Sequence, residues 1–378
     1  MGHGLSRLAQ RYGTPLYVYS FERVSQNLQA LRSAFSRPLR VHYAVKANFH
    51  HGLLKKLKKL NVGVDVVSGG EIKRALECGF KGQDIIFSGV AKSEEEIKFS
   101  LRQGIHIFNV ESPQELIRIG QIARALKKVA SVSFRLNPNV NPKTHPYITT
   151  GFRENKFGMD KSYFPELLKI VRKYSPRLAL VGLDFHIGSQ LLDIAPFEEA
   201  VRRAVPLFKD LQSLGYPMKH FDIGGGTGIP YEGKKSFNMA AYGRRMEALL
   251  KDVDAEILCE PGRYLVGDAG VLLTKVEYVK KNPYKTFVIV NTGMHHLMRP
   301  ALYQAFHKIL PIKEKYKNMG KVDVVGPICE SSDWLAQKRP MPQVSPGEIL
   351  AICDTGAYGY VMASDYNLHD KPTEILLD

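Results

Sequence analysis

The feature that most constrains the fold is a regular alternation of short apolar runs with amphipathic stretches between residues 40 and 260. The apolar runs predict buried parallel strands, and the stretches between them predict helices. Eight such units in about 250 residues are typical of a (β/α)8 barrel. An open doubly wound sheet is the alternative, but the runs give no sign of an edge strand. The candidate strands are 40–46, 62–68, 84–89, 106–110, 131–137, 180–187, 220–224 and 256–260.

The pattern changes after about residue 265, where strand-like runs follow one another with Gly and Pro turns and few long helices. Such a pattern predicts an all-β region. A further strand-like run at 15–19 precedes the barrel and is expected to pair with this second domain. The predicted fold class is therefore α/β, a TIM-like (β/α)8 barrel plus a C-terminal all-β domain. The barrel is expected at 22–267, and the β-sandwich or barrel-like domain at 1–21 and 268–378.

The chain of 378 residues carries a formal net charge of +16. A nucleic-acid-binding surface would concentrate basic residues and aromatics on one element. Here the basic residues are scattered, with small clusters at 55–59 and 313–317 whose helical spacing indicates solvated faces. We therefore expect no specific nucleic-acid partner. The positive field would instead attract an anionic substrate or cofactor.

The cysteines and the apolar runs bear on location and on metals. Cys78, Cys259, Cys329 and Cys353 form neither a CxxC pair nor a zinc-binding spacing, so the sequence predicts no metal site and a reducing compartment. No apolar run approaches the roughly 20 residues that span a bilayer. The first residues lack the apolar core of a signal peptide. We expect a cytoplasmic protein without a membrane partner.

Lys46 stands where the first predicted barrel strand runs out. Partial desolvation at such a position would lower the pKa of an amine, and a neutral amine can attack a carbonyl to form a Schiff base. A lysine that merely extends its ammonium to solvent is the alternative, and it is the commoner case for an isolated lysine.

The other predicted strands also end in polar residues or glycines. Arg135 ends the fifth, His186 to Ser189 the sixth, a glycine run at 224–228 the seventh, and Glu260 to Arg263 the eighth. The carboxyl ends of the strands form the functional face of these barrels, and loops seven and eight often bind phosphate. Glycine backbone N–H groups can approach a phosphate closely.

A lysine able to form an imine, a phosphate cradle, a carboxylate and an aromatic ring together suit pyridoxal 5'-phosphate. Glu260 would keep the pyridine nitrogen protonated, and His186 would stack on the ring. For His186 the alternative is a core histidine with satisfied ring nitrogens.

These residues lie in motifs that resemble the diaminopimelate decarboxylase family, within the alanine-racemase-like barrel group of pyridoxal-phosphate enzymes. The resemblance runs in order from about residue 10 to the last residue. One triplet departs from it, because Ser88-Gly89-Val90 stands where the family more usually has His-Gly-Asn. The matching motifs are YAVKAN (43–48), DVVSGGE (65–71), THPYITTG (144–151), ENKFGM (154–159), HIGSQ (186–190), GGG (224–226), EPGR (260–263), MRPALY (298–303), GPICES (326–331) and GAYG (356–359).

The resemblance implies a role for each of these positions. Lys46 would bond to the cofactor and Cys329 would act as the acid, so these two are the catalytic residues. The substrate would be held by Arg263, Arg299, Tyr303, Glu330 and Tyr358. The cofactor would be held by Lys46, Arg135, His186, Ser189, Gly225, Gly226, Glu260, Gly262, Arg263 and Tyr358. A homodimer with shared active sites is also implied.

The implied reaction is decarboxylation of meso-2,6-diaminopimelate to L-lysine and CO2, the last step of lysine biosynthesis. The distal end of that substrate carries a carboxylate and an ammonium, whose charges Arg299 and Glu330 complement. Decarboxylation of another basic amino acid, namely ornithine, lysine or carboxynorspermidine, is the nearest alternative. An amino-acid racemase and a non-enzymatic cofactor carrier are the others. For Cys329, a buried structural cysteine is the alternative, and for Tyr303 and Tyr358 it is core packing.

Overall fold

The computed structural model describes residues 2–141, 155–233, 236–313 and 317–378. Within these residues the chain divides into two compact units. One contains residues 28–228 and 237–264, and the other contains residues 1–27, 229–236 and 265–378. No helix among the described residues is long and apolar enough to cross a membrane.

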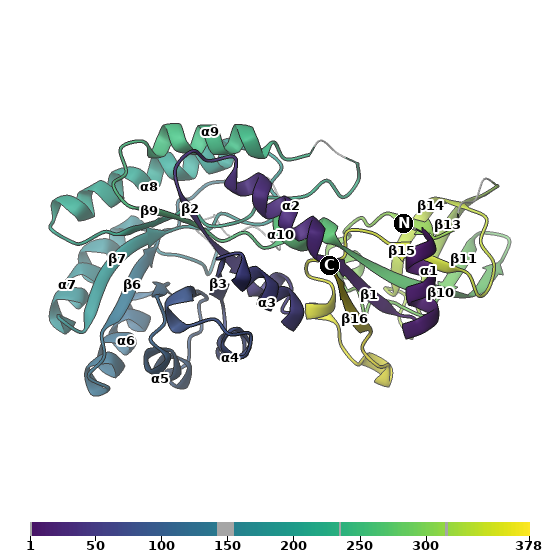
Figure 1. Ribbon diagram of the computed structural model, residues 1–378, viewed down its shortest axis with the longest axis horizontal. Coiled ribbons are helices and arrows are strands. Elements are labelled where there is room, and N and C mark those ends of the chain that lie inside the picture. The colour runs from purple at the N-terminus through teal and green to yellow at the C-terminus, as the bar shows by residue number, and fades with distance from the viewer. Residues whose placement is uncertain (1, 142–154, 234–235, 314–316) are drawn as a thin grey trace. The chain divides into compact units, whose positions relative to one another are not determined.

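The first unit is a closed barrel of parallel strands in chain order, from β2 to β9, with helices outside it (Figure 1). This confirms the predicted barrel and excludes the open sheet. The strands are β2 (Leu39–Ala44), β3 (Gly63–Val66), β4 (Ile85–Phe87), β5 (Ile107–Val110), β6 (Ala130–Arg135), β7 (Leu178–Asp184), β8 (His220–Asp222) and β9 (Glu256–Cys259). The helices are α3 (His51–Lys59), α4 (Gly69–Glu77), α5 (Glu94–Gln103), α6 (Pro113–Ala125), α7 (Phe164–Tyr174), α8 (Ala195–Ser213) and α9 (Met239–Leu250).

Three consecutive helices begin with the same local signal. Ser68, Ser93 and Ser112 each accept a hydrogen bond from the backbone N–H three residues later, where a glutamate stands. The Ser-x-x-Glu spacing satisfies N–H groups that have no partner within the helix, and so fixes where the helix starts. The carboxyl ends of β3, β4 and β5 therefore turn into their helices at defined points.

The interior of the barrel is filled by side chains from opposite sides. Ile86, Ile107, Val181 and Leu258, from β4, β5, β7 and β9, form one buried cluster. Because side chains alternate along a strand, residues two and four positions away from these point into the same interior. At each end of the barrel, polar residues from different strands therefore point toward the barrel axis and toward one another.

The second unit is built on one sheet, whose main path runs β12-β15-β10-β11-β13-β14. The predicted strand near residue 15 is β1 (Leu16–Ser20), and it lies between β10, antiparallel, and β16, parallel. The remaining strands are β10 (Gly270–Lys281), β11 (Thr286–Val290), β12 (Ile309–Pro311), β13 (Asn318–Val325), β14 (Trp334–Pro342), β15 (Ile349–Ile352) and β16 (Thr373–Leu377).

The two faces of β1 pack on different layers. Leu16 and Val18 join a cluster with Ala9 and the partly buried Leu5 of α1 (Gly2–Tyr12). Tyr17 and Tyr19 face the larger core of the unit. Strand alternation explains this division, so α1 covers one face of the sheet.

The sequence analysis did not predict β12, β14 or the helices α1 and α2 (Phe21–Arg32). It also did not predict the short helices α10 (Arg263–Val266) and α11 (Arg299–Tyr303). β14 reads Trp-Leu-Ala-Gln-Lys-Arg-Pro-Met-Pro, which has two prolines and no clean alternation.

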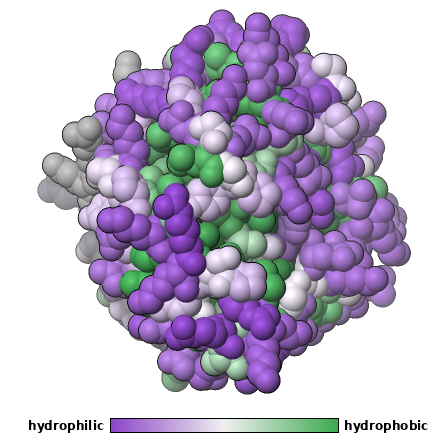
Figure 2. Space-filling view, turned by 90° about the vertical axis from the view of Figure 1, so that its left-hand side faces the viewer, coloured by the Kyte–Doolittle hydropathy of each residue, from purple (hydrophilic) through white to green (hydrophobic). Residues whose placement is uncertain are grey.

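The face seen in Figure 2 is largely hydrophilic, and apolar residues show in patches between the hydrophilic ones.

Gly243 in α9 gives a test of how tightly the barrel helices pack. A Cβ at Gly243 would lie 1.9 Å from the carbonyl oxygen of Ala34. Gly243→Ala should lower the free energy of unfolding by about 1–3 kcal/mol, because overpacking outweighs the gain in helix propensity. Urea unfolding measures it. Gly70→Ala in α4 is the control, since its Cβ would meet only Ser68 Oγ at 3.6 Å. Equal stabilisation by both substitutions would contradict this packing.

Candidate active site

Polar side chains gather at the carboxyl ends of the barrel strands. Lys46 was predicted to be the last residue of the first barrel strand. It lies instead in a short 3-10 turn (Val45–Ala47) directly after β2. Its Nζ donates to Asp65 Oδ2 at 2.8 Å. Asp65 is fully buried at the end of β3, whereas the Lys46 side chain is 36% exposed. The amine is therefore held by a carboxylate and also reaches solvent.

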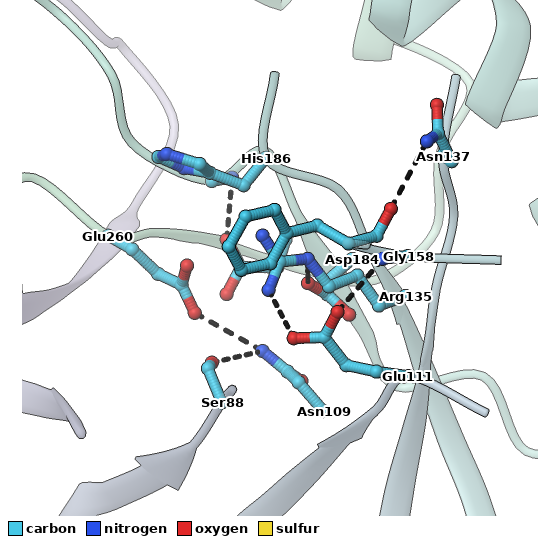
Figure 3. A network of polar contacts seen from close by, with 12 residues as sticks. Ser88, Asn109, Glu111, Arg135, Asn137, Gly158, Asp184, His186 and Glu260 are labelled. Carbon is cyan, nitrogen blue, oxygen red and sulfur yellow. Dashed lines mark hydrogen bonds and ion pairs between the residues drawn. The ribbon is translucent and has the colours of Figure 1, made fainter. Parts of the chain in front are cut away.

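Glu260 is buried directly after β9 and lies in a hydrogen-bonded chain (Figure 3). Asn109 Nδ2 donates to Glu260 Oε1 at 3.2 Å and to Ser88 Oγ at 3.1 Å. Burial, with the neighbouring Asp65 and Asp222 carboxylates, raises the pKa of Glu260 well above its usual range. The side chain is thus fixed in position and biased toward its protonated form.

Arg135 ends β6 and is enclosed by two carboxylates. Its Nη1 donates to Glu111 Oε1 at 2.5 Å, and its Nε lies 3.9 Å from Asp184 Oδ2. The second oxygen of Glu111 accepts from the Gly158 backbone N–H at 2.8 Å. Burial raises the pKa of Asp184 well above its usual range, and Arg135 opposes that rise.

His186 follows β7, near Arg135 (Figure 3). Its Nδ1 accepts a hydrogen bond from the Gly225 backbone N–H at 3.3 Å. Burial, together with the positive charges of Arg135 and Lys46, lowers the pKa of His186 well below its usual range. The imidazole is therefore neutral with its proton on Nε2, and one edge of the ring is anchored by the glycine loop.

The glycine loop after β8 packs directly against its neighbours. A Cβ at Gly225 would lie 2.1 Å from the carbonyl oxygen of Glu260. Gly226 has φ of +105°, and a Cβ there would lie 2.3 Å from the carbonyl oxygen of Gly188. Only glycine fits these positions. Beside this loop, the buried Arg263 donates from Nη2 to Ser189 Oγ at 3.1 Å.

Buried negative charge exceeds buried positive charge at this end of the barrel. Asp65 Oδ1, Asp184 Oδ1 and Asp222 Oδ2 are buried and have no hydrogen-bond partner in the described part of the chain. Buried polar atoms without partners are costly. These unsatisfied acceptors suit a cationic donor, which the protonated ring nitrogen of pyridoxal phosphate would supply.

Gly262 directly precedes Arg263 in the barrel unit, and the remaining predicted residues belong to the second unit. Arg299 in α11 (Arg299–Tyr303) is buried, lies 4.4 Å from the centre of the Tyr231 ring, and contacts His307 Nε2 from Nη1 at 2.8 Å. Cys329 is exposed, which rules out a buried structural role for it within this chain. Tyr303 is half-buried, so full core packing does not describe it.

Glu330 and Tyr358 have unusual surroundings in the same unit. The exposed Glu330 accepts hydrogen bonds from the Tyr366 hydroxyl and from Ser332 Oγ. The bond from Tyr366 lowers the pKa of Glu330. Tyr358 is half-buried and has φ of +55°, a conformation that side chains other than glycine rarely adopt. Such a conformation persists only where the surrounding structure holds it.

The comparisons with known proteins agree with this geometry. Residues 21–267 match the family described as "Pyridoxal-dependent decarboxylase, pyridoxal binding domain". A diaminopimelate decarboxylase of Aquifex aeolicus is 43% identical over 378 residues, which cover 100% of this chain and 90% of the relative. The chain belongs to the diaminopimelate decarboxylase family.

Solved structures of related decarboxylases have the same fold as this chain. A diaminopimelate decarboxylase of Helicobacter pylori, crystallised with L-lysine, has a TM-score of 0.95 and 43% identity, covering 99% of this chain and 94% of that one. A lysine decarboxylase of Selenomonas ruminantium has a TM-score of 0.87 and 27% identity, covering 98% of this chain and 94% of that one. The predicted fold class, family and pyridoxal-phosphate cofactor are therefore confirmed.

The structure brings the barrel residues of the decarboxylase together and adds ones that the sequence analysis missed. Asp65, Asn109, Glu111, Asp184 and Asp222 were not singled out. All but Asn109 are carboxylates within one residue of a strand's end, and reading every strand end for acids would have found them. The motif at 144–151 lies outside the described residues.

Asp222 gives a test of the buried charge. Burial raises the pKa of Asp222 to about 7. The folded state therefore keeps a proton that the unfolded state loses near about pH 4, so stability falls as the pH rises between these values. In cofactor-free protein, the unfolding free energy of wild type relative to Asp222→Asn should fall by about 1–3 kcal/mol from about pH 4 to about pH 7. Urea unfolding across pH measures the difference.

The exposed Asp210 provides the matched control for this test. Asp210→Asn should follow the wild-type pH dependence throughout. Parallel curves for wild type and Asp222→Asn would show that the pKa of Asp222 is the same in the folded and unfolded states, which would contradict the raised value.

Proposed function

We propose that the protein decarboxylates meso-2,6-diaminopimelate to L-lysine and CO2, the last step of lysine biosynthesis. The observation that carries this is the joint presence of a strand-end lysine, a buried Glu260 and a Ser189–Arg263 pair on a chain that matches diaminopimelate decarboxylases over its whole length. Free cysteines in the described residues support a reducing, cytoplasmic location.

Different barrel residues would contact different parts of the cofactor. Lys46 would hold the cofactor through its amine, and Glu260 would pair with the protonated ring nitrogen. His186 presents a neutral ring face. The phosphate is held by Ser189, Gly225, Gly226, Gly262 and Arg263, and Arg135 steadies the surrounding carboxylates. When bound, pyridoxal phosphate withdraws the electrons that the departing carboxylate leaves behind.

The second unit supplies the substrate-side groups. Arg299 and Glu330 carry the charges that complement the distal carboxylate and ammonium, while Arg263, Tyr303 and Tyr358 orient the reacting end. Tyr358 also touches the cofactor. The Cys329 thiol delivers a proton to the α-carbon after CO2 leaves, and its exposure makes it accessible for that step. Holding the α-carboxylate out of water favours its loss, because a charged group is less stable without hydration.

We further propose that two chains share each site in a homodimer. The barrel domain of 22–267 in one chain would bind the cofactor, and the domain of 1–21 and 268–378 in the other would supply Cys329 and Glu330. Both residues are exposed in the single chain, which supports such a role. No specific nucleic-acid or membrane partner is proposed.

Decarboxylation of ornithine, lysine or carboxynorspermidine is the second candidate, because the barrel chemistry is the same and a lysine decarboxylase shares the fold. The buried cation of Arg299 favours a substrate with a distal carboxylate. A racemase would not need an acid such as Cys329 beside Glu330.

Substrate choice is tested by measuring CO2 release. The cofactor-loaded protein should release CO2 from meso-diaminopimelate, and much less from L-ornithine, L-lysine or D-lysine. Lys46→Ala should fall to the protein-free level. Glu330→Gln should raise KM for diaminopimelate by about tenfold, the value of one hydrogen bond to a charged group. Release mainly from L-ornithine or L-lysine would keep the mechanism and overturn the proposed substrate.

Phosphate binding is tested by cofactor affinity. Arg263→Gln should weaken pyridoxal-phosphate binding by about 10–100-fold, because a charge-assisted contact to phosphate is lost. Equilibrium titration followed by cofactor absorbance measures the affinity. Arg245→Gln is the control, since Arg245 forms an exposed ion pair with Glu198 at 3.0 Å. Unchanged affinity in Arg263→Gln, with its fold intact by circular dichroism, would exclude Arg263 from the phosphate site.

A further inference from the structure

Three histidines and a glutamate meet at the amino-terminal ends of the barrel strands, the end opposite the candidate active site. His42 lies on β2, His106 directly precedes β5, His220 begins β8 and Glu256 begins β9. His220 and Glu256 stand two and four residues before Asp222 and Glu260, so strand alternation turns them toward the same barrel interior.

The ring nitrogens and the carboxylate converge. The His106 and His220 ring centres are 4.8 Å apart, and the His42 ring stacks beside His106 at 6.3 Å. His220 Nδ1 lies 3.2 Å from Glu256 Oε2. One ligand atom from each of His106, His220 and Glu256 lies within 4.8 Å of the other two. Zn²⁺ bonds of about 2.0–2.2 Å place ligand atoms about 3.3 Å apart. The His220–Glu256 pair already has this spacing, and the third ligand atom would have to move closer to hold an ion.

The histidine nitrogens are poorly satisfied without a ligand. Among the described residues, neither ring nitrogen of the fully buried His42 has a hydrogen-bond partner, and neither does His106 Nε2. His220 Nδ1 has only its contact with Glu256. The polypeptide thus buries several lone pairs or N–H groups at a cost that a bound ion would offset.

Histidines bind metal ions as neutral imidazoles, and the surroundings of these rings disfavour the charged form. Burial lowers the pKa of His42 well below its usual range, and burial together with His220 lowers that of His106 to about 4. Burial also lowers the pKa of His220, and Glu256 opposes this change.

Some charged groups around the histidine cluster would repel a bound cation, and others would attract it. Arg40 lies 3.4 Å from Glu256 Oε1 and would repel a cation, but both side chains are more than a third exposed and free to separate. Lys219 adds positive charge near His220, and Asp84 adds negative charge near His106.

The cluster has room and access. A Cβ at Gly63 would lie 2.4 Å from His42 Cδ2, so glycine at this position leaves space for the ring. A surface depression of about 770 Å³ reaches Glu256, but neither His106 nor His220 lines it. Its lining also includes the cations Arg32, Arg37, Arg40 and Lys58, which an approaching ion would have to pass. Glu256 is therefore the ligand that solvent reaches.

We propose that His106, His220 and Glu256 bind one divalent transition-metal ion with the ligand preferences of Zn²⁺, two imidazoles and a carboxylate leaving one position for water. The sequence analysis, which looked for cysteine spacing, predicted no metal site. The ion would join β5 to β8 and β9 across the barrel. Residues at this face of such barrels serve stability, so the ion would act as a structural brace.

The test uses chelator-treated, cofactor-loaded protein titrated with ZnCl2 in a calorimeter. We expect one Zn²⁺ per chain and a rise in Tm on saturation, because the ion binds only the folded state. His106→Gln and His220→Gln should each weaken binding at least about tenfold, since even a change beside a ligand costs that much. Cofactor absorbance should not change, which separates this site from the active site.

His51→Gln is the matched control, because His51 and Glu77 form a similar pair at 3.3 Å on the barrel surface. It should bind Zn²⁺ as wild type does. Glu256→Gln changes a partly exposed side chain, so it tests the site without disturbing the core. Absence of binding at millimolar ZnCl2, or unchanged affinity in Glu256→Gln and either histidine variant, would overturn the proposal. CoCl2 giving the visible spectrum of a site with nitrogen and oxygen ligands would support it.

Discussion

The attraction between buried carboxylates and two cations organises the carboxyl end of the barrel. Lys46 is held by Asp65, and Arg135 lies between Glu111 and Asp184. Removing one partner from such a buried set leaves an uncompensated charge, which costs about 3–5 kcal/mol. Because each member comes from a different strand, the charges also fix the strand ends relative to one another. The site is therefore ordered before any ligand arrives.

Burial raises the pKa values of Asp184, Asp222 and Glu260, and the neighbouring carboxylates raise them further. A bound cationic ring would turn a destabilising cluster into a favourable one. Stability of the folded protein and affinity for its cofactor are thus two results of the same electrostatic imbalance.

The sequence predicted the barrel because its strands are short, apolar and regularly spaced, and it predicted Lys46, Arg135, His186 and Glu260 because each follows such a run. It missed Asp65 and Asp184, since a single acid after a strand has many ordinary explanations. It also missed β14, whose prolines hide the alternation, and α1, whose apolar face has meaning only once β1 is in the sheet. The grouping of His42, His106 and His220 depends on barrel closure, which no local pattern reveals.

The pairing of β1 has a consequence for the order of assembly. Leu16 is aligned with Thr373 and Ser20 with Leu377, so a strand made at the start of synthesis obtains its parallel neighbour only at the end. The barrel strands, by contrast, pair with neighbours next along the chain, apart from the closing contact of β2 with β9. Contacts between distant segments form slowly. The barrel can therefore fold before the rest of the second unit is made, whereas β1 must wait for β10 and then for β16.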